Sequence, residues 1–207
     1  MKVLLVNGSP RKNGCTNAAL TEVAVTLKQE GVDSEILWLG VEPIQDCVAC
    51  GGCGRSGACV IRGDAVELLV EKAKESDGFV FGTPVYYAHP NGRILSALDR
   101  AFYSGGSYFV RKPAAAVASA RRAGTTASLD VLNKYFTIAQ MPVVSSTYWN
   151  MVHGAKAEDV AQDLEGLQSM RNLARNMAWL LKCIELGRQS GVTAPEAEKG
   201  FRTNFIR

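Results

Sequence analysis

Short apolar runs alternate with amphipathic segments along most of the chain, and this alternation restricts the fold more than any other feature. Nearly continuous apolar runs predict strands at 2–7, 34–39, 79–81, 112–119 and 142–145. Apolar residues at helical spacing predict helices at 16–29, from 64 to at least 73, at 90–102, from after 124 to about 138, and at 158–186. Strands and helices that alternate in this way build a parallel sheet with helices on both faces. The expected fold class is therefore α/β, with a doubly wound five-stranded parallel sheet.

Ligands of doubly wound sheets bind at the carboxyl ends of the strands. We therefore expect the chemistry of this chain in the loops 8–16, 40–63, 83–90 and 120–125.

The composition excludes several classes of function. A chain of 207 residues with 47% hydrophobic and 21% charged residues has the size and balance of one globular domain. Its net charge of +3 and its scattered basic pairs argue against a nucleic-acid partner. No apolar window approaches the length of a membrane span, and Met1 leads directly into an expected strand without room for a signal peptide. We expect a cytoplasmic protein without a membrane partner, whose six cysteines do not form a disulfide framework.

The loop after the first strand has the residues of a phosphate site. Ser9, Arg11, Asn13, Gly14 and Thr16 stand between the strand and the next helix. Hydroxyl, amide and guanidinium donors then meet the positive end of a helix dipole, which suits an anion. The loop lacks the GK[ST] ending of a P-loop and the G-x-G-x-x-G of a dinucleotide fold. A single terminal phosphate, held by side chains and loop amides, fits the loop better.

Three motifs in a fixed order carry a resemblance to a known family. They are Asn7-Gly-Ser-Pro-Arg-Lys-Asn-Gly-Cys-Thr16, Gly82-Thr-Pro-Val-Tyr-Tyr87 and Ser119-Ala-Arg-Arg-Ala-Gly124, and residues 203–207 are also similar to a family ending. Together they resemble the flavodoxin-like NADPH-dependent FMN reductases, a superfamily that includes the iron–sulfur flavoproteins and the multimeric flavodoxin-like quinone reductases. One departure is Cys15, where the family usually has Asn before the Thr.

The resemblance implies a flavodoxin-like sheet in the order 2-1-3-4-5, within a domain at 1–186 that has a cysteine-rich insertion at 40–63 and a tail at 187–207. It also implies an FMN site and a homodimer or homotetramer, with FMN near a subunit boundary. The expected FMN-binding residues are Ser9, Arg11, Asn13, Gly14, Cys15, Thr16, Asn17, Thr83, Pro84, Val85, Tyr86, Tyr87, Arg121, Arg122 and Gly124. The residues from Ser9 to Asn17 would face the phosphate, and Tyr86 and Tyr87 would offer flat aromatic faces to the flavin ring. Either Arg121 or Arg122 would stabilise the anion of the reduced flavin near N1.

Four cysteines crowd into thirteen residues of the long loop, at Cys47, Cys50, Cys53 and Cys59. Zinc usually takes two separated C-x2-C pairs, whereas a four-iron cluster accepts closer spacing. The C-x2-C-x2-C-x5-C motif resembles that of the iron–sulfur flavoproteins, which implies a [4Fe–4S] cluster held by all four thiolates. A zinc site, a thiol redox site or a flavin lid remain alternatives, because relatives without a demonstrated cluster have similar loops.

The sequence therefore predicts an FMN-dependent oxidoreductase. The expected donor is NAD(P)H or a protein, and the acceptor is a quinone, an aromatic substrate, a flavin or a protein. No catalytic side chain is required, because flavin N5 carries the chemistry. The alternative is a non-enzymatic electron carrier of the flavodoxin or iron–sulfur flavoprotein kind.

Overall fold

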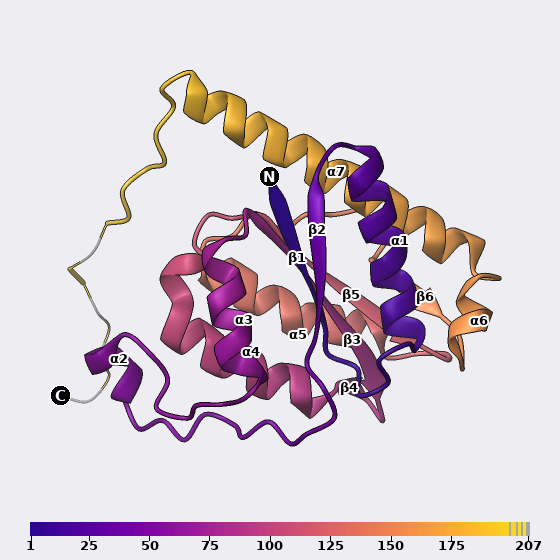
Figure 1. Cartoon of the computed structure of the whole chain (residues 1–207), viewed down its shortest axis with the longest axis horizontal. Helices are drawn as coiled ribbons and strands as arrows, with labels where there is room; N and C mark the ends of the chain where they lie inside the picture. The colour runs from indigo at the N-terminus through magenta and orange to yellow at the C-terminus, as the bar shows by residue number, and fades with distance from the viewer. Residues whose placement is uncertain (199, 202, 204, 206–207) are drawn as a thin grey trace.

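The chain forms a doubly wound α/β domain (Figure 1). This computed structural model describes residues 1–198, 200, 201, 203 and 205. Positions 204, 206 and 207 of the expected family ending lie outside the described residues. Within the described part, no helix is long and apolar enough to cross a bilayer.

Five parallel strands make the sheet in the spatial order β2-β1-β3-β5-β6. The predicted order 2-1-3-4-5 is thereby confirmed, with one short strand added where the chain turns back antiparallel on the end of β3. The strands are β1 (Lys2–Asn7), β2 (Asp33–Trp38), β3 (Gly78–Tyr86), β4 (His89–Pro90), β5 (Ala114–Ala120) and β6 (Met151–His153).

Helices cover both faces of the sheet, as the apolar strands require. Successive residues of a strand point to opposite faces, so Val3 and Leu5 pack on one side and Leu4 and Val6 on the other. On the first side lie α1 (Cys15–Gln29) and α7 (Leu164–Gln189), with the short α6 (Ala157–Val160) beside α1. The other side has α3 (Ala65–Lys74), α4 (Gly92–Gly105), the 3-10 turn Gly106–Tyr108 and α5 (Thr125–Ile138).

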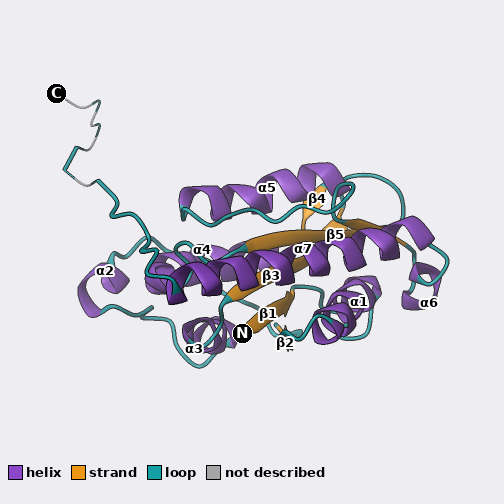
Figure 2. Cartoon of the chain, turned by 90° about the horizontal axis from the view of Figure 1, so that it is seen from above, coloured by secondary structure: helices purple, strands orange, loops and turns teal. Residues whose placement is uncertain are grey.

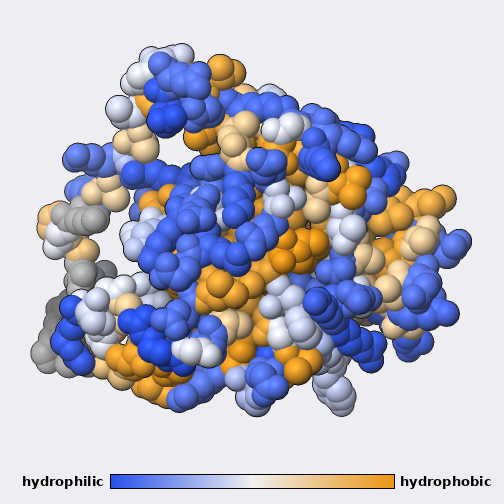
Figure 3. Space-filling model, viewed as in Figure 1, coloured by the Kyte–Doolittle hydropathy of each residue, from blue (hydrophilic) through white to orange (hydrophobic). Residues whose placement is uncertain are grey.

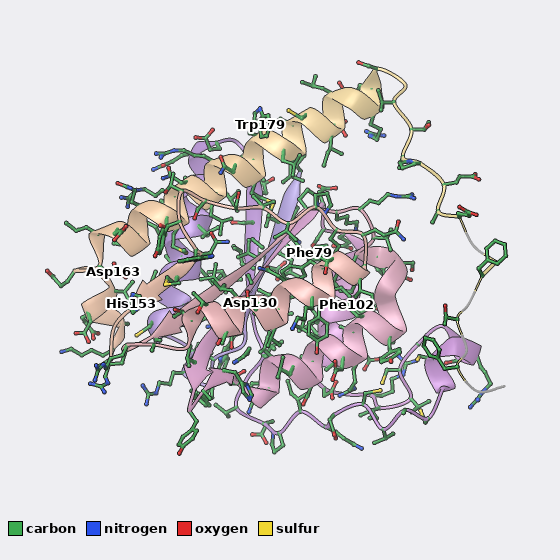
Figure 4. All side chains as sticks on the ribbon, turned by 180° about the vertical axis from the view of Figure 1, so that it is seen from behind. Phe79, Phe102, Asp130, His153, Asp163 and Trp179 are labelled. Atoms are coloured by element: carbon green, nitrogen blue, oxygen red, sulfur yellow. The ribbon has the colours of Figure 1, made fainter. Side chains whose placement is uncertain are left out.

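The core combines small side chains in β5 with aromatic side chains on the α4–α5 side of the sheet. Strand β5 is built almost entirely of alanine and is buried along its whole length, which lets the helices on both sides approach the sheet closely. Phenylalanines fill the space on the α4–α5 side, where the rings of Phe102 and Phe109 stack with centroids 4.4 Å apart and Phe79 lies 4.9 Å from Phe109. Figure 4 shows Phe79 and Phe102 facing this interior.

The last predicted strand is misplaced. The prediction at 142–145 is wrong except for one isolated parallel bridge between Ala114 and Val143. The fifth parallel position is taken instead by β6, whose residues pair with the end of β5. Within this segment Val144 packs into the core on the α1–α7 side, where it is 5% exposed, whereas Val143 is 42% exposed.

Two helix predictions also change, and one short helix is added. Pro90 was expected in the first turn of a helix, but it ends β4, and Asn91 caps α4 by accepting a hydrogen bond from Ile94 N at 3.0 Å. The expected helix 158–186 is two helices, because the Asp163 side chain accepts from Gly166 N and starts α7 there. The cysteine loop contains a short helix, α2 (Gly52–Ser56), that was not predicted.

Candidate functional site

The loop between β1 and α1 is held in shape by a buried asparagine. Asn7, at the end of β1, is fully buried, and its Oδ1 accepts from Ser9 N at 3.0 Å while its Nδ2 donates to Lys12 O at 3.1 Å. Ser9 Oγ in turn accepts from Arg11 N at 3.1 Å. These hydrogen bonds are local, so they fix the conformation of the loop without a ligand.

The first turn of α1 lacks the usual cap. Its N-cap is Gly14, no side chain among the described residues caps it, and the first turn has no acidic residue. Helix N-termini carry unpaired N–H groups and a partial positive charge, which acids or capping oxygens normally satisfy. An anion at this position would satisfy them.

Strand β5 supplies a further hydroxyl to this loop. Thr16 Oγ1 and Ser119 Oγ lie 2.8 Å apart, and both residues are buried. Thr16 is among the residues predicted for the phosphate loop, whereas a binding role for Ser119 is not predicted from the sequence. Their hydrogen bond ties the start of α1 to the carboxyl end of β5, so the two loops form one site.

Two further supports were not predicted from the sequence. Trp38, at the end of β2, donates Nε1 to Ser9 O at 2.8 Å, and Lys12 Nζ lies 5.6 Å from the centre of its ring. Asn91 donates Nδ2 to Gly8 O at 2.7 Å. Both partners are backbone carbonyls that come close only in the folded chain, so no local motif marks them.

A hollow of about 280 Å³ opens where β1, β3, β5 and β6 end. Of the expected FMN residues, the hollow brings together Ser9, Arg11, Gly14, Cys15, Thr16, Pro84, Val85, Tyr86 and Arg121. Ser119, Ala120, Gly154 and Ala155 complete its described lining.

The remaining expected residues stand behind or beside the hollow. Asn17 Oδ1 accepts from Asn7 Nδ2 at 3.4 Å, and Thr83 is buried with its hydroxyl on Pro84 O and Asn91 N. Asn13 and Tyr87 are exposed, and Tyr87 has a φ of +58°.

The arginine pair is divided by the structure. Arg121 lines the hollow, whereas the carbonyl of Arg122 lies 3.1 Å from His153 Nε2. Asp163 Oδ2 accepts from His153 N at 2.6 Å and lies 3.6 Å from its Nδ1, and Figure 4 shows these two side chains together where β6 meets α7. Gly124 starts α5 at φ +91°, where a Cβ would lie 2.7 Å from Val85 Cγ1. The loop 121–124 is therefore fixed at both ends beside the hollow.

Cys15 lies at the edge of this hollow with its thiol turned to the backbone. Its Sγ donates to Gly154 O at 3.4 Å, and burial raises the pKa of the thiol. A thiol with a raised pKa stays protonated at neutral pH, so Cys15 serves the loop as a small neutral side chain.

The four loop cysteines line a second hollow of about 220 Å³. Apolar residues form most of its wall, and α4 closes one side with Arg100, Tyr103 and Ser104. In the view of Figure 3, hydrophobic residues gather at the lower left of the molecule, over the loop that carries α2. Figures 1 and 2 both place α2 at the far end of the molecule from α6.

The sulfur atoms share this hollow without converging. Among the residues that the structure describes, no three His, Cys, Asp or Glu side chains lie close enough together to hold a metal ion. The donor chemistry nevertheless suits iron and sulfide, because four thiols face one apolar cavity in a tightly curled loop. Ala49, Gly51 and Gly57 have φ of +51°, +66° and +71°, which produces that curl. The sixth cysteine, Cys183, is exposed on α7.

Arg100 is the most buried charged residue described beside this loop, at 1% exposure. It forms an ion pair with Asp64, whose side chain is 22% exposed. Burial opposes the charge of the guanidinium, but hydrogen bonds to Asp64 and Cys59 outweigh it and raise the pKa of Arg100. The loop therefore closes against a permanent positive charge.

Comparisons with known proteins identify the family and the fold of the chain. The NADPH-dependent FMN reductase family matches residues 1–156. An iron–sulfur flavoprotein of Methanocaldococcus jannaschii is 30% identical over 193 residues, covering 89% of this chain and 100% of its own. Among solved structures, RosB with bound 8-demethyl-8-formylriboflavin-5'-phosphate superposes with a TM-score of 0.68 at 15% identity, over 100% of this chain and 92% of its own. An archaeal flavodoxin superposes with a TM-score of 0.59 at 14% identity, over 88% and 99%. The resemblance noted in the sequence is thereby confirmed, and the chain belongs to the NADPH-dependent FMN reductase family.

Proposed function

We propose that this protein is an FMN-dependent oxidoreductase that takes electrons from NAD(P)H. The uncapped N-terminus of α1 carries the proposal: Gly14 offers no capping side chain, and the hollow in front of it is lined by Ser9, Arg11 and Thr16. A phosphate monoester supplies the negative charge that this turn lacks. The family match and the iron–sulfur flavoprotein relative support FMN as the molecule that brings it.

The residues of the chain bind and orient the cofactor. Ser9, Arg11, Thr16 and the free amides of the first turn hold the phosphate, with Thr16 fixed by Ser119. The backbone from Pro84 to Tyr86 borders the ring, and Arg121 places a positive charge in the same hollow. A bound FMN supplies the hydride-accepting and electron-donating chemistry at N5, which explains why the hollow needs no nucleophile or general base.

The four loop cysteines hold a [4Fe–4S] cluster in this proposal. The support is their shared hollow, the glycine-rich curl of the loop and the iron–sulfur flavoprotein of similar length. Thiolate ligation requires the side chains to turn toward one point from their present positions. The electron acceptor is then a quinone, a flavin or another protein. The chain itself works as a homodimer or homotetramer.

One anaerobic purification tests these assignments together. We expect an absorption spectrum with flavin bands and a broad iron–sulfur shoulder, and bleaching of the flavin bands on addition of NADPH or NADH. Flavin without bleaching by either nucleotide would leave the electron-carrier alternative. One zinc per chain without sulfide would remove the cluster from the proposal, and light scattering on the same sample gives the oligomeric state.

A further inference from the structure

Every donor of the Arg100 guanidinium has a partner in the cysteine loop. An arginine carries five N–H donors, and five hydrogen bonds are formed here. Nε donates to Cys59 Sγ at 3.5 Å; Nη1 donates to Gln45 O at 3.2 Å and to Asp64 Oδ2; Nη2 donates to Ile61 O at 3.0 Å and to Asp64 Oδ1 at 3.2 Å.

These partners stand at both ends of the loop. Gln45 precedes the first cysteine, and Ile61 and Asp64 follow the last one. Asp64 is also the N-cap of α3, where its Oδ1 accepts from Val66 N at 3.1 Å. One buried side chain on α4 therefore closes the loop 45–64 and connects it to α3 at the same time.

We propose that Arg100 is the positioning residue of the cysteine site: it fixes the loop around the hollow and raises the reduction potential of the cluster through its bond to Cys59. This inference rests on the proposed cluster. Reduction adds negative charge to a cluster, and N–H donors to its sulfurs set the potential. A donor that carries a positive charge favours the reduced form.

Asp64 acts in the opposite direction. Its carboxylate neutralises part of the Arg100 charge, so the effect on the potential depends on the pair. A lysine could not replace Arg100, because an ammonium has three donors and no planar fork with which to reach four residues.

Arg93 provides a matched control on the same helix. It lies seven residues before Arg100, two turns away on the same face. It binds the start of the same loop by donating to Glu42 O and, at 2.6 Å, to Val41 O, and neither of these two bonds reaches a sulfur. Loss of Arg93 thus loosens the loop without changing a cysteine contact.

The test compares R100M, R100K, D64N and R93M with the wild-type full chain, all purified without air. Iron and sulfide per chain, the rate of iron loss to a chelator and the midpoint potential of the cluster are measured, with far-UV circular dichroism to confirm folding. For R100M we expect a lower potential and faster iron loss, by about the 10- to 100-fold factor by which metal affinity falls when a hydrogen-bond partner of a metal ligand is removed. D64N keeps a helix-capping oxygen and should have a higher potential. R93M should match the wild type in potential.

Opposite shifts in R100M and D64N distinguish the electrostatic role from a purely structural one. Equal potentials in all folded variants, or shifts of the same sign in R100M and D64N, would overturn the assignment of Arg100 alone. If R100M does not fold, R100K and D64N carry the comparison, and R100K is expected to lose iron faster than R93M. A wild-type protein without iron and sulfide would overturn the proposed cluster and this role with it.

Discussion

The Asn91 side chain joins α4 to the loop between β1 and α1, and its contribution to stability can be dissected by substitution. It is 2% exposed; its Oδ1 caps α4 at Ile94 N, and its Nδ2 donates to Gly8 O at 2.7 Å. A lost N-cap costs about 1 kcal/mol, and a buried carbonyl left unpaired costs about 1–3 kcal/mol. N91A should therefore lower the free energy of unfolding by about 2–4 kcal/mol.

Two further variants separate the terms. N91S keeps a capping oxygen and loses only the bond to Gly8, so its loss should be about 1–3 kcal/mol. N91D keeps the cap but turns a carboxylate oxygen toward the Gly8 carbonyl, and should be the least stable of the three because a charge is buried without a donor.

Urea unfolding of the FMN-free protein at pH 7, followed by far-UV circular dichroism, measures these differences. The control is N176D, because Asn176 also donates its amide to a carbonyl, Ser145 O at 2.8 Å, but in an exposed position on α7. N176D should change the stability by less than about 0.5 kcal/mol. Wild-type stability in N91D would refute the role of the Gly8 bond, and equal losses in N91S and N91A would refute the role of the cap.

Three other variants test the remaining features. R11A combined with T16A should weaken FMN binding at least about tenfold, since bonds to a charged group contribute about 1.5–3 kcal/mol each; unchanged binding by equilibrium dialysis would mean that the phosphate lies elsewhere. C50S should abolish the iron–sulfur absorbance and leave FMN bound, and loss of flavin as well would make the loop structural. Lys72 and Lys2 lower the pKa of Glu35 by hydrogen bonding. Because that pKa is depressed on folding, its stabilisation is present above the unfolded pKa and is lost as the pH falls through the folded one. E35Q should therefore melt below the wild type at pH 7 by a margin that shrinks as the medium becomes acidic, and a margin that does not change with pH would contradict the ion pairs.

The sequence predicted what depends on local pattern. The alternation of apolar runs was enough for the doubly wound α/β class, and the family resemblance supplied the strand order. The hollow in front of α1 lies in the loop where the anion site was expected. The last strand was misplaced because the apolar residues at 142–144 match the pattern of a strand. Strand β6 has only three residues, which is too short for a recognisable apolar pattern.

Contacts between distant residues could not be predicted. Arg100 lies 41 residues from Cys59, and Asn91 lies 83 residues from Gly8. The positions of Arg121 and Arg122 likewise involve a distant contact, because the Arg122 carbonyl meets the ring of His153, whose backbone N donates to Asp163. In each case the side chain looks like an ordinary polar residue until the sheet brings its partner close.

Gly14 at the start of α1 also affects the stability of the chain before a cofactor binds. A serine or aspartate at position 14 would stabilise the empty chain, and would compete with a phosphate for the same amides. Gly14 provides no such side chain, so in the proposed function the bound phosphate supplies that stabilisation. A ligand present at 100 times its dissociation constant adds about 2.7 kcal/mol to folding stability. A newly made chain is accordingly most exposed to proteolysis when flavin is scarce, and its abundance in the cell should follow flavin supply.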